Sequence, residues 1–240
     1  MTRQQTVMLA ALALLLALVS MSYLWGMFKQ EGETAESETV EDVALVHEGD
    51  IEVQKQALFA LSQSSSEQSL KHLIAFATGH DHPEVRKQAI FWLSQKENHT
   101  AWEALDQIVE DDPILAVQKQ VLFAYSQMPR EVGSPRLVRI ARSHEHREMQ
   151  EQAIFWLGQQ GGEDALALFD ELIAGEAEVA VQKKVVFAFS QMPKDAGVPR
   201  LITVAKDHRS EEVRKQAVFW LGQANDDRAR EALVELVENQ

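Results

Sequence analysis

Apolar residues along this chain recur in a long, regular repeat. One eleven-residue motif with apolar residues at helical spacing occurs six times, with unbroken spacing between its copies. The copies are VQKQALFALSQ (53–63), VRKQAIFWLSQ (85–95), VQKQVLFAYSQ (117–127), MQEQAIFWLGQ (149–159), VQKKVVFAFSQ (181–191) and VRKQAVFWLGQ (213–223). Alternate copies are closer relatives, since 14 of 21 positions agree between residues 116–136 and 180–200. The duplicated unit therefore contains two copies of the motif.

A second set of apolar-periodic segments separates the motifs. These segments are 70–77, 101–109, 135–141, 164–173, 199–205 and 228–237. Asp112 before Pro113, Ser134 before Pro135 and Asp81 three residues before Glu84 are typical helix starts. Each repeat is thus predicted to be two antiparallel helices. Residues 39–46 are predicted to form a degenerate first helix. The charged helix 228–238 would close the array with its polar face.

The N-terminal segment 1–29 differs from the repeats. No charge lies between Arg3 and Lys29, and residues 4–28 are long enough to cross a bilayer as a helix. We expect residues 1–29 to be a single-pass anchor, although Ser20-Met21-Ser22 also suits a cleaved signal, which would make the protein secreted. Acidic residues follow Lys29, so either interpretation puts the repeats on the extracytoplasmic, periplasmic side. Residues 30–38 are predicted to be a flexible acidic linker.

Charge and cysteine content exclude several functions. All 37 acidic residues but only 21 of the 23 basic residues lie beyond residue 30, which gives that part a formal charge of −16. A surface of this charge repels nucleic acid, so no nucleic-acid partner is expected. The absence of cysteine excludes disulfides, thiolate catalysis and Cys-based zinc sites.

The paired helices resemble a known family. The pattern V-R-x-x-A-x-x-x-L-G in the second helix is similar to the bacterial HEAT-like repeats first described in phycobilin lyases, and the resemblance covers residues 39–240. It implies an all-α fold, an α-solenoid (α-α superhelix) of six helix pairs with the second helices lining a concave face. The family's motif is specific for fold and unspecific for function.

Helical geometry assigns the motif positions to a core side and an opposite side. Positions one, five, eight and nine point in a common direction, which predicts the core. Position eight alternates between alanine and Trp92, Trp156 or Trp220, and position nine becomes aromatic in two of the three alanine copies. Such volume compensation is typical of a packed interior, so we expect these tryptophans in the core.

Position seven is phenylalanine in all six copies and faces away from that core. Lysine at position three and glutamine at position eleven lie on the same strip, except that Glu151 replaces the fourth lysine. The row either packs between neighbouring helices or forms a partner-binding ladder along the concave groove. The predicted protein-binding residues are Phe91, Phe123, Phe155, Phe187, Lys119, Gln127 and Gln159.

Candidate catalytic and metal sites are weak. HEAT-repeat deoxyhypusine hydroxylases bind two irons through His-Glu pairs inside repeat helices, whereas the equivalent motif interiors here hold Lys-Gln, Glu-Gln or Lys-Lys. His80, His144 and His208 recur once in each duplicated unit, and His82 and His146 complete two His-x-His pairs that lack a nearby third ligand. Histidines at helix ends are also typical of capping. No metal, cofactor or catalytic residue is predicted.

These observations favour a membrane-anchored, non-enzymatic scaffold that holds a protein or peptide ligand in the concave groove. The alternative is an enzyme or chromophore-handling lyase of the phycobilin type, which rests on fold analogy.

Overall fold

The computed structural model describes residues 48–238, which belong to one compact unit, Val46–Gln240. The predicted anchor (4–28), the linker (30–38) and the degenerate helix (39–46) lie outside the described residues. Within residues 48–238 every regular element is an α-helix, and no helix is long and apolar enough to cross a membrane.

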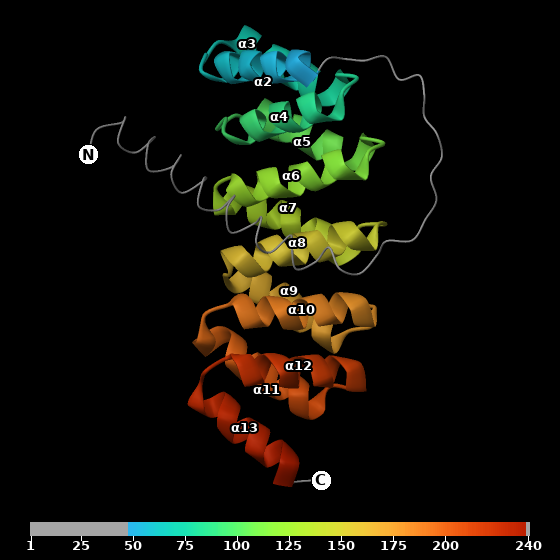
Figure 1. Cartoon of the computed structure of the whole chain (residues 1–240), viewed down its shortest axis with the longest axis vertical. Helices are drawn as coiled ribbons and strands as arrows, with labels where there is room; N and C mark the ends of the chain where they lie inside the picture. Colours follow the sequence, from blue (N-terminus) through green and yellow to red (C-terminus); the bar gives the residue numbers. More distant parts are fainter. Residues whose placement is uncertain (1–47, 239–240) are drawn as a thin grey trace, which may run out of the picture. The chain divides into compact units, whose positions relative to one another are not determined.

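Twelve helices follow one another in the described residues (Figure 1). They are α2 (Glu48–Ser62), α3 (Glu67–Gly79), α4 (Pro83–Ser94), α5 (His99–Asp111), α6 (Leu115–Gln127), α7 (Arg130–Ser143), α8 (Arg147–Gln160), α9 (Glu163–Ala174), α10 (Val179–Gln191), α11 (Lys194–Asp207), α12 (Glu211–Gln223) and α13 (Asp227–Glu238). Each motif copy lies in an even-numbered helix. The predicted helical solenoid is confirmed.

The helices form two rows. Each even helix packs against the next even helix, so the even helices stack as one continuous row (Figure 1). Each also packs against its odd neighbours in sequence, except that α8 and α9 make little contact. In the odd row, α3 packs on α5, α7 on α9, and α11 on α13. The closer contacts in the odd row thus recur once in every two repeats, in agreement with the duplicated unit of two motifs. Ion pairs join α5 to α7, through Arg136 and Asp106, and α9 to α11, through Arg200 and Asp170.

The core lies between the rows but is rotated from its predicted direction. Positions one, five and nine are buried from the second motif copy onward, as predicted. Position six is also buried, through Leu58, Ile90, Leu122, Ile154 and Val186. Trp92, Trp156 and Trp220 are only partly buried, so their placement in the core was wrong. The true core direction lies between positions one and six, because both helix rows contact that side.

Three predicted helix starts also need correction. α7 begins at Arg130 after Pro129, so Pro135 lies inside the helix. α4 is capped by His82, whose side chain accepts a hydrogen bond from the Glu84 N–H, and Asp81 is not the cap. Asp112 ends α5, and its carboxylate accepts from the N–H of Ile114, the residue that caps α6. Only α4 receives a side-chain cap from a residue next to the expected one, because Ile114 and Pro129 make no side-chain hydrogen bond to the free N–H groups of α6 and α7.

Candidate functional site

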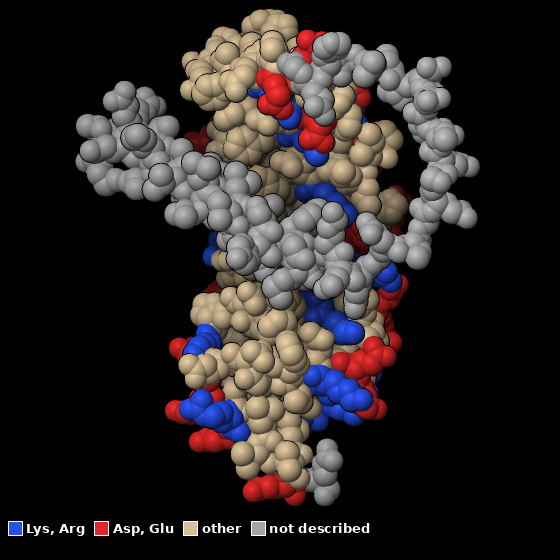
Figure 2. Space-filling view, in the orientation of Figure 1, with Lys and Arg blue, Asp and Glu red and all other residues tan. Residues whose placement is uncertain are grey.

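An aromatic band runs along the even helices. It comprises the position-seven phenylalanines and the position-eight tryptophans: Phe59, Phe91, Phe123, Phe155, Phe187, Phe219, Trp92, Trp156 and Trp220. The phenylalanines of α4, α6, α8 and α10 are half-buried, and Phe59 and Phe219 at the two ends are exposed. Figure 2 shows uncharged surface over α10 and α12 with charged side chains on both sides of it.

Each tryptophan of the band lies between two phenylalanines. The ring centroid of Trp156 is 5.3 Å from that of Phe123 on α6 and 5.0 Å from that of Phe155 on its own helix. The Phe91 and Phe123 rings stack at 6.4 Å. These distances are those of favourable aromatic pairs. Three of the predicted binding residues, Phe91, Phe123 and Phe155, therefore form one cluster through Trp156.

The fourth predicted phenylalanine belongs to a second cluster. Phe187 lies 5.3 Å from Trp220, which also contacts Phe219 at 5.0 Å. The sequence interpretation did not include Trp156 or Trp220 in the band. The signal for them was the alternation of tryptophan with alanine beside an unvarying phenylalanine, because Ala124 and Ala188 are buried at that position whereas the tryptophans are only partly buried.

Four of the five lysines in the strip pair with acids, namely Lys55, Lys87, Lys119 and Lys215. Lys119 Nζ on α6 lies 2.5 Å from the Glu148 carboxylate on α8 and holds the pKa of that carboxyl below its usual range through a hydrogen bond. Glu151, the acid in the row, pairs with Lys184 of α10 and Arg147 of its own helix at 3.5 Å. The edge of the aromatic band is thus a salt-bridged rim and not a row of unpaired cations.

The glutamines of the strip differ in whether a neighbouring serine hydroxyl hydrogen-bonds their side-chain amide. The Gln127 amide donates to the Ser126 hydroxyl at 3.1 Å, and that hydroxyl donates to the Phe123 carbonyl at 2.7 Å. In α8, Gly158 occupies the serine position because a Cβ there would lie 2.9 Å from the Ala188 Cβ. Gln159 is exposed and has no neighbouring hydroxyl to hold its amide. Its amide can hydrogen-bond a partner's backbone.

The recurring histidines stabilise the turns that follow α3, α7 and α11. The Nδ1 atoms of His80, His144 and His208 accept the backbone N–H two residues later, at 3.0 to 3.1 Å. Among residues 48–238, no group of three or more His, Asp and Glu side chains could hold a metal ion.

The residue at motif position two donates to the carbonyls that end the preceding helix. Arg86 and Arg214 donate to the His80 and His208 carbonyls at 2.7 Å, and Gln118 donates to the Asp112 carbonyl at 2.9 Å. These carbonyls have no partner within their own helix, so a donor there stabilises the helix pair. This buried polar position went unrecognised in the sequence.

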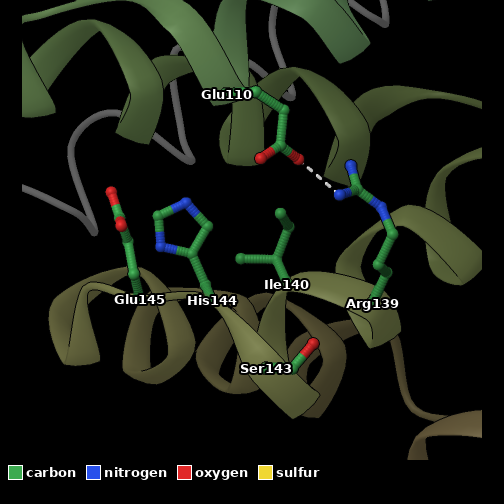
Figure 3. A pocket seen from close by; sticks show the side chains of 6 residues that line it. All are labelled: Glu110, Arg139, Ile140, Ser143, His144 and Glu145. Atoms are coloured by element: carbon green, nitrogen blue, oxygen red, sulfur yellow. Dashed lines mark hydrogen bonds and ion pairs between the residues drawn. The ribbon is translucent and has the colours of Figure 1, made fainter.

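A polar pocket lies on the opposite side of the array, between the ends of α5 and α7. Figure 3 shows Glu110 of α5 directed at Arg139 of α7, with His144 and Glu145 beyond the end of α7. Glu110 accepts a hydrogen bond from Arg139, which raises the pKa of the guanidinium. Glu110 is thus already paired with a guanidinium, whereas Glu145, the second acid of the pocket, has its side chain exposed to solvent.

Comparisons with known proteins place this geometry in a family. Residues 43–126 match the family model for HEAT repeats, and residues 213–239 match that for the PBS lyase HEAT-like repeat. The protein is a HEAT-repeat protein. No curated protein matches the chain.

The solved structures that are similar to it include two enzymes or enzyme complexes. Human deoxyhypusine hydroxylase in complex with glycerol has a TM-score of 0.36 and 18% identity, over 80% of this chain and 75% of that one. The complex of CpcE and CpcF of phycocyanin lyase from Nostoc sp. PCC7120 has a TM-score of 0.39 and 19% identity, over 84% and 85%. At these identities the likeness concerns the fold alone.

The comparisons contradict the prediction that the chain is not an enzyme. The repeat model that matches residues 213–239 is named for a lyase. We therefore correct that prediction: the HEAT-repeat fold of this chain is compatible with an enzymatic role.

Proposed function

We propose that this HEAT-repeat protein binds a protein partner through the aromatic band of its even helices. The observation that carries the proposal is the half-buried cluster of Phe91, Phe123, Trp156 and Phe155, flanked by the salt-bridged rim. Half-buried aromatic side chains held rigidly by their neighbours supply apolar contact area at little entropic cost. Phe187 extends the surface to α10, and Lys119, Gln127 and Gln159 supply its polar contacts.

We expect Phe155→Ala to weaken partner binding by about 2 kcal/mol, roughly thirtyfold in affinity, because central aromatic anchors dominate interfaces. Gln159→Ala should weaken binding with no change in melting temperature, since its side chain is exposed. The partner is first identified by capture from the native source, and affinities of purified proteins are then measured together with thermal melting.

Gln68→Ala is the matched control, because Gln68 is an exposed glutamine on α3, in the odd row. It should bind like the wild type. Unfolding by Phe155→Ala without selective loss of binding, together with a silent Gln159→Ala, would show that the phenylalanines serve packing alone.

A lyase-type activity is the second candidate function. The match of residues 213–239 to the PBS lyase HEAT-like repeat favours it over a scaffold without chemistry. In this case the aromatic band would hold the acceptor protein together with the chromophore to be attached to it. Incubation with a free bilin and a candidate acceptor protein tests this candidate, since covalent attachment gives a coloured band under denaturing conditions. A colourless acceptor would leave partner binding as the function.

We also propose that residues 4–28 anchor the protein in a membrane, with the repeats on the extracytoplasmic side. The uncharged stretch followed by acidic residues supports this proposal. The mass of the mature protein from native membranes should include residues 1–29. A chain that starts at Tyr23 would instead mean cleavage and secretion.

A further inference from the structure

The two ends of the helix array expose positions that are buried inside it. On α2, Val53 at motif position one is 68% exposed, whereas its equivalents in the later helices are at most 3% exposed. Ala57 and Ala60, at positions five and eight, are also exposed. On α12, Val218 is 37% exposed, although the other position-six residues are fully buried. Each end thus lacks the neighbour that an interior repeat has.

The last described helix, α13, leaves two apolar side chains exposed at its end of the array. A solenoid end in contact with water is expected to carry a polar outer face, and helix 228–238 was predicted to supply one. α13 also exposes Val234 and Val237, the latter at 79%. The equivalent of Val237 in α5, Val109, is completely buried. The other exposed residues of α13 are charged, so this end combines a polar face with two exposed valines.

The two ends are complementary in register. Among the described residues, α2 is a second helix with no first helix before it, and α13 is a first helix with no second one after it. In the interior, α5 packs on α6 and α9 packs on α10. A copy of α2 placed after α13 would complete the same kind of pair.

The alternation of motif types also continues across such a junction. At motif position eight, α12 carries tryptophan and α2 carries alanine. The same change from tryptophan to alanine occurs inside the array from α4 to α6 and from α8 to α10. In the interior step, Gly158 of α8 faces Ala188 of α10, where an added Cβ would lie 2.9 Å from the alanine Cβ. Their equivalents at the ends are Gly222, which has open space around it, and the exposed Ala60.

The exposed ends of the aromatic band would meet at the same junction. Phe219 and Phe59, which are 54% and 45% exposed, correspond to Phe91 and Phe123, whose rings stack at 6.4 Å. We infer that the α12–α13 end of one copy docks on the α2 end of a second copy. This head-to-tail contact is heterologous, so it produces open chains or rings rather than a closed two-fold dimer. The inference is independent of the proposed partner and of any enzymatic activity.

Two variants test the junction from its two sides. Gly222→Leu fills the open space at the α12 end, and Ala60→Arg places a charge on the exposed α2 face. Neither residue is buried, so both variants should melt like the wild type. The full chain is studied by sedimentation velocity at increasing concentration. The wild type should show species of two or more chains, and each variant alone should stay monomeric.

Mixing the two variants distinguishes the head-to-tail contact from other modes. The Ala60→Arg copy keeps an intact α12–α13 end and the Gly222→Leu copy keeps an intact α2 end, so an equal mixture should form a dimer and nothing larger. Gly79→Leu on α3, also in open space, is the matched control and should assemble like the wild type. A wild type that stays monomeric, for example because residues before α2 cover this face, would overturn the inference. Ala60→Arg chains that still associate would overturn it too.

Discussion

Arg86→Ala is expected to lower the free energy of unfolding by about 3 to 5 kcal/mol, the largest effect of any single substitution proposed for this protein. The Arg86 guanidinium forms two hydrogen bonds to the Asp112 carboxylate, at 2.9 and 3.2 Å, and both side chains are more than nine-tenths buried. A third bond runs to the His80 carbonyl at 2.7 Å. Truncation leaves the buried Asp112 carboxylate with only the Ile114 N–H as a donor, and it removes the donor to the His80 carbonyl. Chemical denaturation measures the loss.

A matched control and a double substitution separate the charge from the packing. Arg214 occupies the same motif position and donates to the His208 and Arg209 carbonyls, but it is only partly buried, so Arg214→Ala should cost less. Arg86→Met combined with Asp112→Leu should regain most of the stability, because apolar pairs can replace buried ion pairs. Equal, small losses from Arg86→Ala and Arg214→Ala would contradict the buried pair.

Gly133→Ala should destabilise the protein by about 3 kcal/mol, at the upper end of ordinary overpacking. A Cβ on Gly133 would lie 2.0 Å from the Tyr125 carbonyl oxygen, which is backbone and cannot rotate away. Only Met128 and Pro129 connect α6 to α7, so the first turn of α7 is held against the last turn of α6. Gly197 makes the same approach to the Phe189 carbonyl in the next duplicated unit.

Gly79→Ala is the control for this substitution. Gly79 also lies in a helix, but nothing would lie within 4 Å of its added Cβ. Alanine there should be neutral or slightly stabilising because it has the higher helix propensity. Thermal melting of the two variants is the comparison. A Gly133→Ala protein that melts like Gly79→Ala would mean that α6 and α7 do not approach this closely.

The repeat made most of the fold predictable from the sequence. Six motif copies in unbroken register located the even helices, and the apolar segments between them located the odd ones. The rotation of the core could not be found the same way, because α-helical geometry leaves position six on the border between the core and solvent. Its burial depends on how closely the two rows pack.

The aromatic band could be predicted only in part from the sequence, for a related reason. A phenylalanine row is apparent in the sequence, but whether such a row is exposed depends on the spacing of neighbouring helices. In the structure Trp156 fills the space between Phe123 and Phe155 and leaves all three rings half-buried. Position two was missed because arginine and glutamine usually indicate solvent exposure. Only the structure shows that Arg86 and Gln118 reach buried carbonyls.

Photo-crosslinking in the native cell tests most directly whether the even helices carry the partner site. A photoreactive amino acid is placed at Gln127 or Gln159 beside the aromatic band and, for comparison, at Gln68 or Thr203, which are exposed on the odd row. We predict a discrete crosslinked product from the first two positions that disappears when Phe155→Ala is added, and none from the other two. The same product from Gln68 or Thr203, with none from Gln127 and Gln159, would contradict the proposed binding face.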